Sequence, residues 1–83
     1  MKPLTQYGRM AEKHWRQYLP RLTAELEAKG QLHAMLMEAE EQTDAELDSL
    51  RRHFIRLGLT PQQAHDRAWE IVRERYIFLM PEE

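Results

Sequence analysis

The chain has 83 residues and a mass of 10.0 kDa, which leaves room for one small domain. Its formal net charge of −2 and its pI of about 6.1 give no overall basic footprint for nucleic acid. Because cysteine is absent, a disulfide framework, thiol catalysis and a cysteine zinc site are excluded, and a reducing compartment is indicated. The sequence holds no run of about 18 apolar residues and no signal peptide, so we expect a cytoplasmic protein without a membrane span.

The composition predicts an all-α protein, because helix-forming Ala, Leu, Glu, Gln, Met and Arg fill long stretches between only three glycines and four prolines. No alternation of apolar and polar residues suggests a strand. We predict four helical segments, at about residues 5–19, 20–29, 31–57 and 60–78, within a single domain over residues 1–83. The expected architecture is a compact bundle of three to four helices with one long central helix.

The first two segments meet at Pro20, which lacks an amide proton and therefore ends one helix or opens the next. Thr5 can cap the first segment, whereas Gly8 weakens its first turn. Gly30 is a suitable end for the second segment, since glycine readily adopts the left-handed conformation that follows many helices.

An apolar stripe identifies the third segment as the longest helix. The stripe recurs at spacings of three and four residues over about seven turns, a length of roughly 39 Å. Its members are Leu32, Leu36, Ala39, Thr43, Leu47, Leu50, Phe54 and Leu57. Gly58 follows the stripe and predicts its end.

The fourth segment has the clearest start signal, because Thr60–Gln63 reads as a capping box with proline at the first helical position. A wide apolar arc follows, and Pro81–Glu83 is expected to fray. The predicted core of the whole domain consists of Trp15, Leu22, Leu36, Leu47, Leu50, Phe54, Trp69, Ile71 and Val72.

The third helix carries six carboxylates within eleven residues and no basic residue among them. Four of these acids share the predicted solvent side with two apolar residues, which favours contact over pure solvation. The simple interpretation is a solvated face; the sharper ones are a docking strip for a basic partner or a phosphate mimic that occupies a nucleic-acid site. The candidate interface residues are Met37, Glu40, Glu41, Asp44, Asp48 and Ile55.

A basic face on the first helix could instead contact phosphates. Its residues are Arg9, Lys13 and Arg16. A helix-turn-helix interpretation of the last two helices adds contacts near the start of the fourth helix. These are Gln62, Gln63 and His65. Phe54 and Arg67 do not fit that motif, which requires a small residue four before the turn glycine and an apolar residue nine after it. An ordinary helical hairpin is therefore favoured.

The four histidines lie on different segments, with no HExxH motif and no pair at a spacing of four. We therefore predict no metal site and no cofactor. Nothing in the sequence indicates a pocket that would raise the pKa of a carboxylate for acid–base work, and a chain this short rarely houses a catalytic cleft. No catalytic residue is predicted, and the protein is expected not to be an enzyme.

Several short motifs resemble the small transposon-encoded TnpV proteins, which show a Y-G-R-M start, a Y-L pair, an L…G-x-L step into a long helix and a final R-A-x-E-I-V helix. The corresponding residues here are Tyr7-Gly8-Arg9-Met10, Tyr18-Leu19, Leu26, Gly30, Leu32, Leu36 and Arg67-Ala68 with Glu70-Ile71-Val72. The resemblance covers about residues 7–78 and its motifs are packing and turn residues. It implies a bacterial protein carried on mobile elements, in a family without an established activity.

Two functions follow as hypotheses. The first is a non-enzymatic helical interaction module of a bacterial mobile element, which modulates or inhibits a host or element-encoded protein machine through its acidic and apolar helix face. The alternative is a small DNA-binding accessory factor of a transposon that uses the helix-turn-helix-like segment. A protein partner is expected first and DNA second. A domain this small gains little stability from its core, which leaves room for a homo-oligomer.

Overall fold

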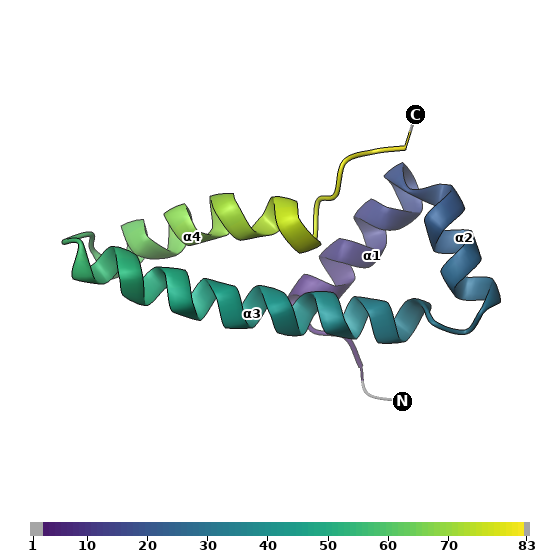
Figure 1. Ribbon diagram of the computed structural model, residues 1–83, viewed down its shortest axis with the longest axis horizontal. Coiled ribbons are helices and arrows are strands. Elements are labelled where there is room, and N and C mark those ends of the chain that lie inside the picture. The colour runs from purple at the N-terminus through teal and green to yellow at the C-terminus, as the bar shows by residue number, and fades with distance from the viewer. Residues whose placement is uncertain (1–2, 83) are drawn as a thin grey trace.

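Four helices make up the secondary structure of residues 3–82, the part of the chain that the computed structural model describes (Figure 1). They are α1 (Gln6–Tyr18), α2 (Pro20–Ala28), α3 (Leu32–Arg56) and α4 (Pro61–Tyr76). No strand occurs among these residues, so the prediction of an all-α fold with one long helix is confirmed.

Local signals account for several of the helix ends, although Thr5, at the N-cap of α1, makes no side-chain cap hydrogen bond. The capping box of α4 is present: Thr60 Oγ1 accepts a hydrogen bond from the Gln63 amide at 3.2 Å, and the Thr60 amide donates to Gln63 Oε1 at 3.1 Å. Gly30 and Gly58 follow α2 and α3 with φ angles of 68° and 102°, a backbone conformation that favours glycine. Pro20 occupies the first position of α2.

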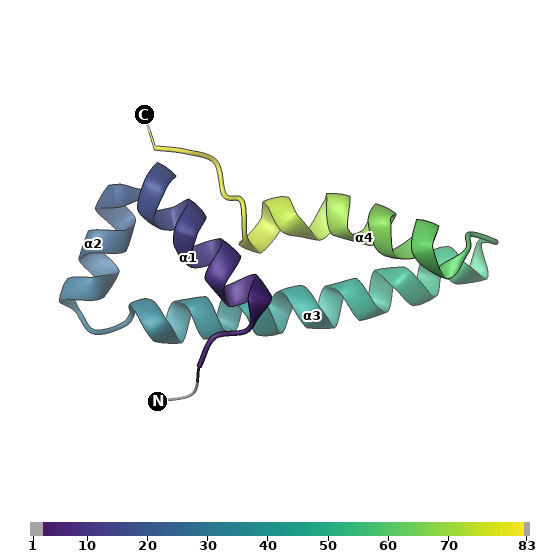
Figure 2. The same cartoon turned by 180° about the vertical axis from the view of Figure 1, so that it is seen from behind.

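The helices lie in a flat arrangement, since the Cα atoms extend over 46 × 32 × 14 Å. Figures 1 and 2 show α3 along most of the long dimension, with α4 running back beside its C-terminal half. From the middle of α3, α1 extends away at an angle, and α2 returns the chain to the start of α3. Long α3 is therefore the element against which the other three are placed.

The buried apolar residues form two clusters along α3. The first, where α1 and the segment after α4 meet α3, contains Ala11, Trp15, Leu19, Leu32, Leu36, Ala39 and Ile77. The second lies between α3 and α4 and contains Leu47, Ala68 and Val72, with Leu50, Phe54 and Trp69 packed against it as partly buried residues. Ile71, a member of the predicted core, is exposed by 38%, and Leu57, the last residue of the predicted apolar stripe, is exposed by 64%. Leu57 is the C-cap residue of α3, just before the turn. The predicted stripe therefore extends one residue beyond the end of the helix.

The segment after α4 is held against α1 and α2. Trp15 Nε1 donates to the Ile77 carbonyl at 3.1 Å, and the Glu82 amide donates to the Tyr18 carbonyl at 2.9 Å. The Glu82 carboxylate accepts hydrogen bonds from the amides of Arg21 and Leu22, both at 3.0 Å, and so caps the start of α2. The expectation that Pro81–Glu83 frays is therefore wrong for Glu82, and Glu83 lies outside the described residues.

Glu46 of α3 joins the end of α4 through two contacts, with Arg75 Nη1 at 2.9 Å and Tyr76 Oη at 2.6 Å. The hydrogen bond from the phenol to this carboxylate raises the pKa of Tyr76 above its ordinary value of 10.0, and desolvation acts in the same direction. Folding thus favours the neutral phenol. The stabilisation is fully present below the ordinary pKa and is lost as the pH rises through the folded-state pKa.

We therefore expect the free energy of unfolding to fall more steeply in the original chain than in a Tyr76→Phe variant as the pH rises from the ordinary tyrosine pKa of 10.0 toward the raised folded-state pKa. Phenylalanine retains the ring packing and lacks the ionisable hydroxyl, so the difference between the two profiles isolates this contact. Denaturant titrations across that range measure it. Parallel profiles for the two proteins would contradict the assignment.

Candidate functional site

The predicted interface residues of α3 are separated by the structure into an exposed group and one buried residue. Glu41 and Asp44 are exposed, Ile55 is exposed by 43%, and Met37 and Asp48 are partly buried. Their spacings of four, three, four and seven residues put them on one flank of the helix. We call these five residues, Met37, Glu41, Asp44, Asp48 and Ile55, the α3 strip.

Glu40 does not belong to this strip, and its assignment to the solvent side is wrong. Its exposed fraction is 4%, and its Oε2 accepts hydrogen bonds from the Thr5 amide at 2.8 Å and the Thr5 hydroxyl at 2.7 Å. Thr5 is the N-cap of α1, where unpaired amides and the helix dipole favour an anion. The carboxylate therefore stabilises the junction of α1 and α3 and is not available to a partner.

Charge is distributed unevenly along the strip. Asp48 is paired within the chain, with Arg51 at 3.2 Å and Arg52 at 2.9 Å. Within residues 3–82, neither Glu41 nor Asp44 makes an ion pair or a side-chain hydrogen bond. The strip thus presents two solvated carboxylates between Met37 at one end and Ile55 at the other.

The basic face of α1 is weaker than its sequence suggests. Arg16 Nη2 lies 2.9 Å from carboxylate oxygens of both Glu12 and Glu27. The hydrogen bond to Glu27 makes the larger contribution to a raised pKa of Arg16, and the hydrogen bond to Glu12 acts in the same direction. The two carboxylates also offset the positive charge of Arg16. Arg9 donates from Nε to the Leu4 carbonyl at 3.3 Å, and Lys13 is exposed. Arg9 and Lys13 remain as the accessible cations of this face.

The start of α4 likewise has few free polar groups. Gln63 is engaged in the capping box, and the Gln62 amide donates to Asp66 Oδ1 at 3.0 Å. His65 is partly buried. These contacts stabilise the first turns of α4, which accounts for the two glutamines without any hydrogen bonds to DNA bases.

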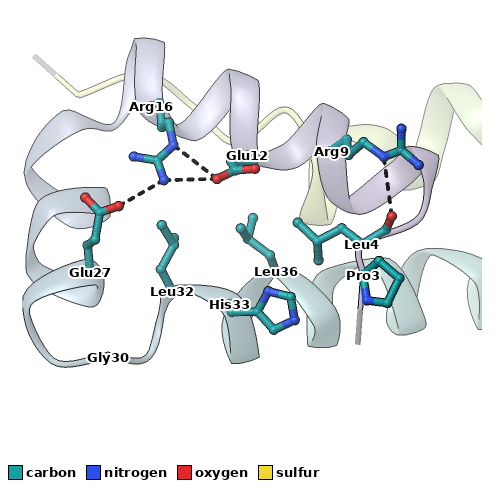
Figure 3. A pocket seen from close by; sticks show the side chains of 10 residues that line it. All are labelled: Pro3, Leu4, Arg9, Glu12, Arg16, Glu27, Gly30, Leu32, His33 and Leu36. Carbon is teal, nitrogen blue, oxygen red and sulfur yellow. Dashed lines mark hydrogen bonds and ion pairs between the residues drawn. The ribbon is translucent and has the colours of Figure 1, made fainter. Parts of the chain in front are cut away.

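An open cavity of about 550 Å³ lies in the triangle of α1, α2 and α3 (Figure 3). Leu4, Leu32 and Leu36 line it with apolar surface, and Figure 3 shows Arg16 reaching toward Glu12 and Glu27 along its upper rim. The charges of Arg16, Glu12 and Glu27 on the rim bind one another. His33 also lines the cavity, and its Nε2 is buried without a hydrogen-bond partner among the described residues. Sequence reasoning missed this cavity because its lining comes from three separate helices, with no shared motif.

Among residues 3–82, no three His, Cys, Asp or Glu side chains gather in a way that could hold a metal ion. Over the same residues, no helix combines the length and the apolar character needed to cross a bilayer. No protein-family model, no curated protein and no solved structure matches the chain.

Proposed function

We propose that the protein is a non-enzymatic interaction module that binds a protein partner through the α3 strip. The observation that carries this proposal is the pair of unpaired carboxylates, Glu41 and Asp44, placed between Met37 and Ile55 on an open helix flank. Exposed charges of one sign increase the rate at which an oppositely charged partner is encountered. Apolar side chains at the same surface can then be buried, which slows dissociation.

The partner's setting is proposed from the sequence resemblance. Similarity to the transposon-encoded TnpV proteins supports a bacterial protein carried on a mobile element. In that setting the module would modulate or inhibit a machine of the element or of the host. A basic groove that normally holds nucleic acid fits the strip by charge, because two carboxylates several ångströms apart along a helix imitate successive phosphates.

The alternative, a small DNA-binding accessory factor, has less support. Four of its six predicted contact residues make side-chain hydrogen bonds within the chain: Arg9 to the Leu4 carbonyl, Arg16 to two carboxylates, Gln62 to Asp66, and Gln63 to Thr60. Duplex binding would then rely on the accessible cations Arg9 and Lys13, with His65 partly buried. Two phosphate contacts supply only a small part of the counterion release on which tight DNA binding depends.

A comparative capture experiment tests the proposal. Tagged original protein, a Glu41→Lys/Asp44→Lys variant and a control Glu38→Lys/Glu70→Lys variant are each used to retain proteins from a bacterial lysate. All four substituted residues are exposed. Each variant replaces two acids by two lysines, so the two variants carry the same change in charge. We expect the original protein and the control to retain the same protein, identified by mass spectrometry, and the strip variant to lose it.

Association and dissociation rates are then measured with the purified partner. Charge reversal in the strip should slow association, whereas Met37→Ala or Ile55→Ala should speed dissociation. A gel-shift titration with duplex DNA is run in parallel. Tight, salt-sensitive duplex binding that disappears on changing Arg9 and Lys13 to glutamate would replace this function by the DNA-binding alternative.

A further inference from the structure

The exposed flank of α3 continues the α3 strip in a regular repeat. Adding Arg51, the positions 37, 41, 44, 48, 51 and 55 are spaced four, three, four, three and four, which is the spacing of the contact positions of a coiled coil. They extend over about 27 Å of helix. All six side chains are exposed or partly buried.

The order of side chains along this repeat is self-complementary when the direction is reversed. Met37 and Ile55 stand at the two ends, and Glu41 and Arg51 stand one position inward. A second copy laid antiparallel, with a two-fold axis midway between positions 44 and 48, therefore places Met37 against Ile55 and Glu41 against Arg51, each contact occurring twice.

The centre of this arrangement brings Asp44 of each copy near Asp48 of the other. That repulsion is reduced because Asp48 already binds Arg51 and Arg52 of its own chain. Arg52 is the more exposed of the two arginines, with 71% of its side chain accessible. It can therefore reach the facing Asp44. A parallel pair would set Glu41 against Glu41 and Arg51 against Arg51, with no compensating contact.

We propose that the chain forms an antiparallel two-fold homodimer through this flank of α3. The inference rests on the proposed function, because both use the α3 strip, and it names a second copy of the chain as one partner of that strip. A two-fold contact buries the same surface on both copies and closes on itself, whereas binding the strip to the basic face of α1 in the next copy would produce rings or open chains. The dimer and a foreign partner compete for one surface, so the free strip becomes scarcer as the protein concentration rises.

Charge reversal within the pair provides a sharp test by sedimentation velocity over a concentration series. We expect the original chain to shift from 10.0 kDa toward twice that mass as concentration increases. Glu41→Lys and Arg51→Glu, each alone, create two like-charge contacts and should weaken the dimer by about tenfold or more. Glu70→Lys and Arg67→Glu, which are exposed positions on α4 away from the repeat, should leave it unchanged.

Two rescues establish the pairing and the integrity of the variants together. An equal mixture of Glu41→Lys and Arg51→Glu chains restores both attractive contacts, so the mixture should dimerise where neither variant does alone. The double variant Glu41→Lys/Arg51→Glu should dimerise with itself. The chain has no cysteine, so Met37→Cys and Ile55→Cys chains can be mixed under oxidation, and we expect a disulfide only between the two different variants.

A chain that stays at 10.0 kDa at all concentrations, or a dimer indifferent to both charge reversals, overturns the inference. Its failure is distinct from failure of the proposed function. If the chain is a monomer but still captures a lysate protein through Glu41 and Asp44, the homodimer inference is overturned and the proposed function stands. Restored dimers without any captured protein support self-association and remove the foreign partner.

Discussion

Replacing Trp15 with alanine should lower the free energy of unfolding by about 3–5 kcal/mol, the usual loss when a large aromatic residue is removed from a core. Trp15 is exposed by only 3% and belongs to the cluster where α1 meets α3 and the segment after α4. Its Nε1 also donates to the Ile77 carbonyl, so the substitution removes both ring packing and a buried hydrogen bond. In a domain of 83 residues this loss is a large part of the total stability.

Two further variants separate these contributions and check the placement of α4. Trp15→Phe retains an aromatic ring and removes the hydrogen bond, so it should fall between the original chain and the alanine variant. Ile71→Ala serves as the control, because Ile71 is 38% exposed and should change the unfolding free energy by less than about 1 kcal/mol. Denaturant titrations give all three values. A loss at position 71 equal to that at position 15 would mean that α4 is rotated from its described orientation.

The secondary structure could be predicted from the sequence because its boundaries depend on local chemistry. Thr60 and Gln63 cap a helix through contacts three residues apart, and Gly30 and Gly58 end helices through their own backbone angles. Pro20 acts on its immediate neighbours. None of these signals needs information about distant parts of the chain.

The errors occur where a distant segment decides the environment. The apolar arc of α4 covers about half of its circumference, and only contact with α3 determines that Val72 is buried while its neighbour Ile71 is exposed. Glu82 is held in place because the first amides of α2, some sixty positions earlier in the chain, donate hydrogen bonds to its carboxylate. No local pattern carries that information.

Glu40 differs from these cases, since a signal for its burial was present. At 100° per residue it lies about 40° from Leu36 and 20° from Leu47, just beyond the edge of the apolar stripe. Because Glu40 is charged, the sequence predicts it on the solvent side. A carboxylate beside the buried face of one helix can also stabilise the N-terminus of a helix packed against it. Within the candidate site, Glu41 and Asp44 lie farther from this stripe, at about 140° and 80° from Leu36, and both are exposed.

The contact between Glu40 and the start of α1 should make Gly8→Ala destabilising by about 1–3 kcal/mol, although alanine is the better helix former. Gly8 is buried, and a methyl group there would collide with Glu40 Oε2 and lie 2.9 Å from Leu4 Cδ2. Glu40→Ala should itself lower the unfolding free energy by about 2 kcal/mol, because the Thr5 amide and hydroxyl lose their charged acceptor.

A double-mutant cycle measures the coupling of the two positions. In the Glu40→Ala background the carboxylate no longer occupies the space beside Gly8 and only the contacts with Leu4 remain, so Gly8→Ala should cost less than it does in the original chain. The interaction free energy between the two sites should then be about 1–3 kcal/mol and favourable to the double variant. Ala24→Gly on the exposed side of α2 provides the matched control, since it reports the glycine–alanine difference in a helix without a nearby acid. If Gly8→Ala stabilises the original chain by as much as glycine destabilises position 24, Glu40 does not approach α1 as described, and its carboxylate would return to the set of groups available to a partner.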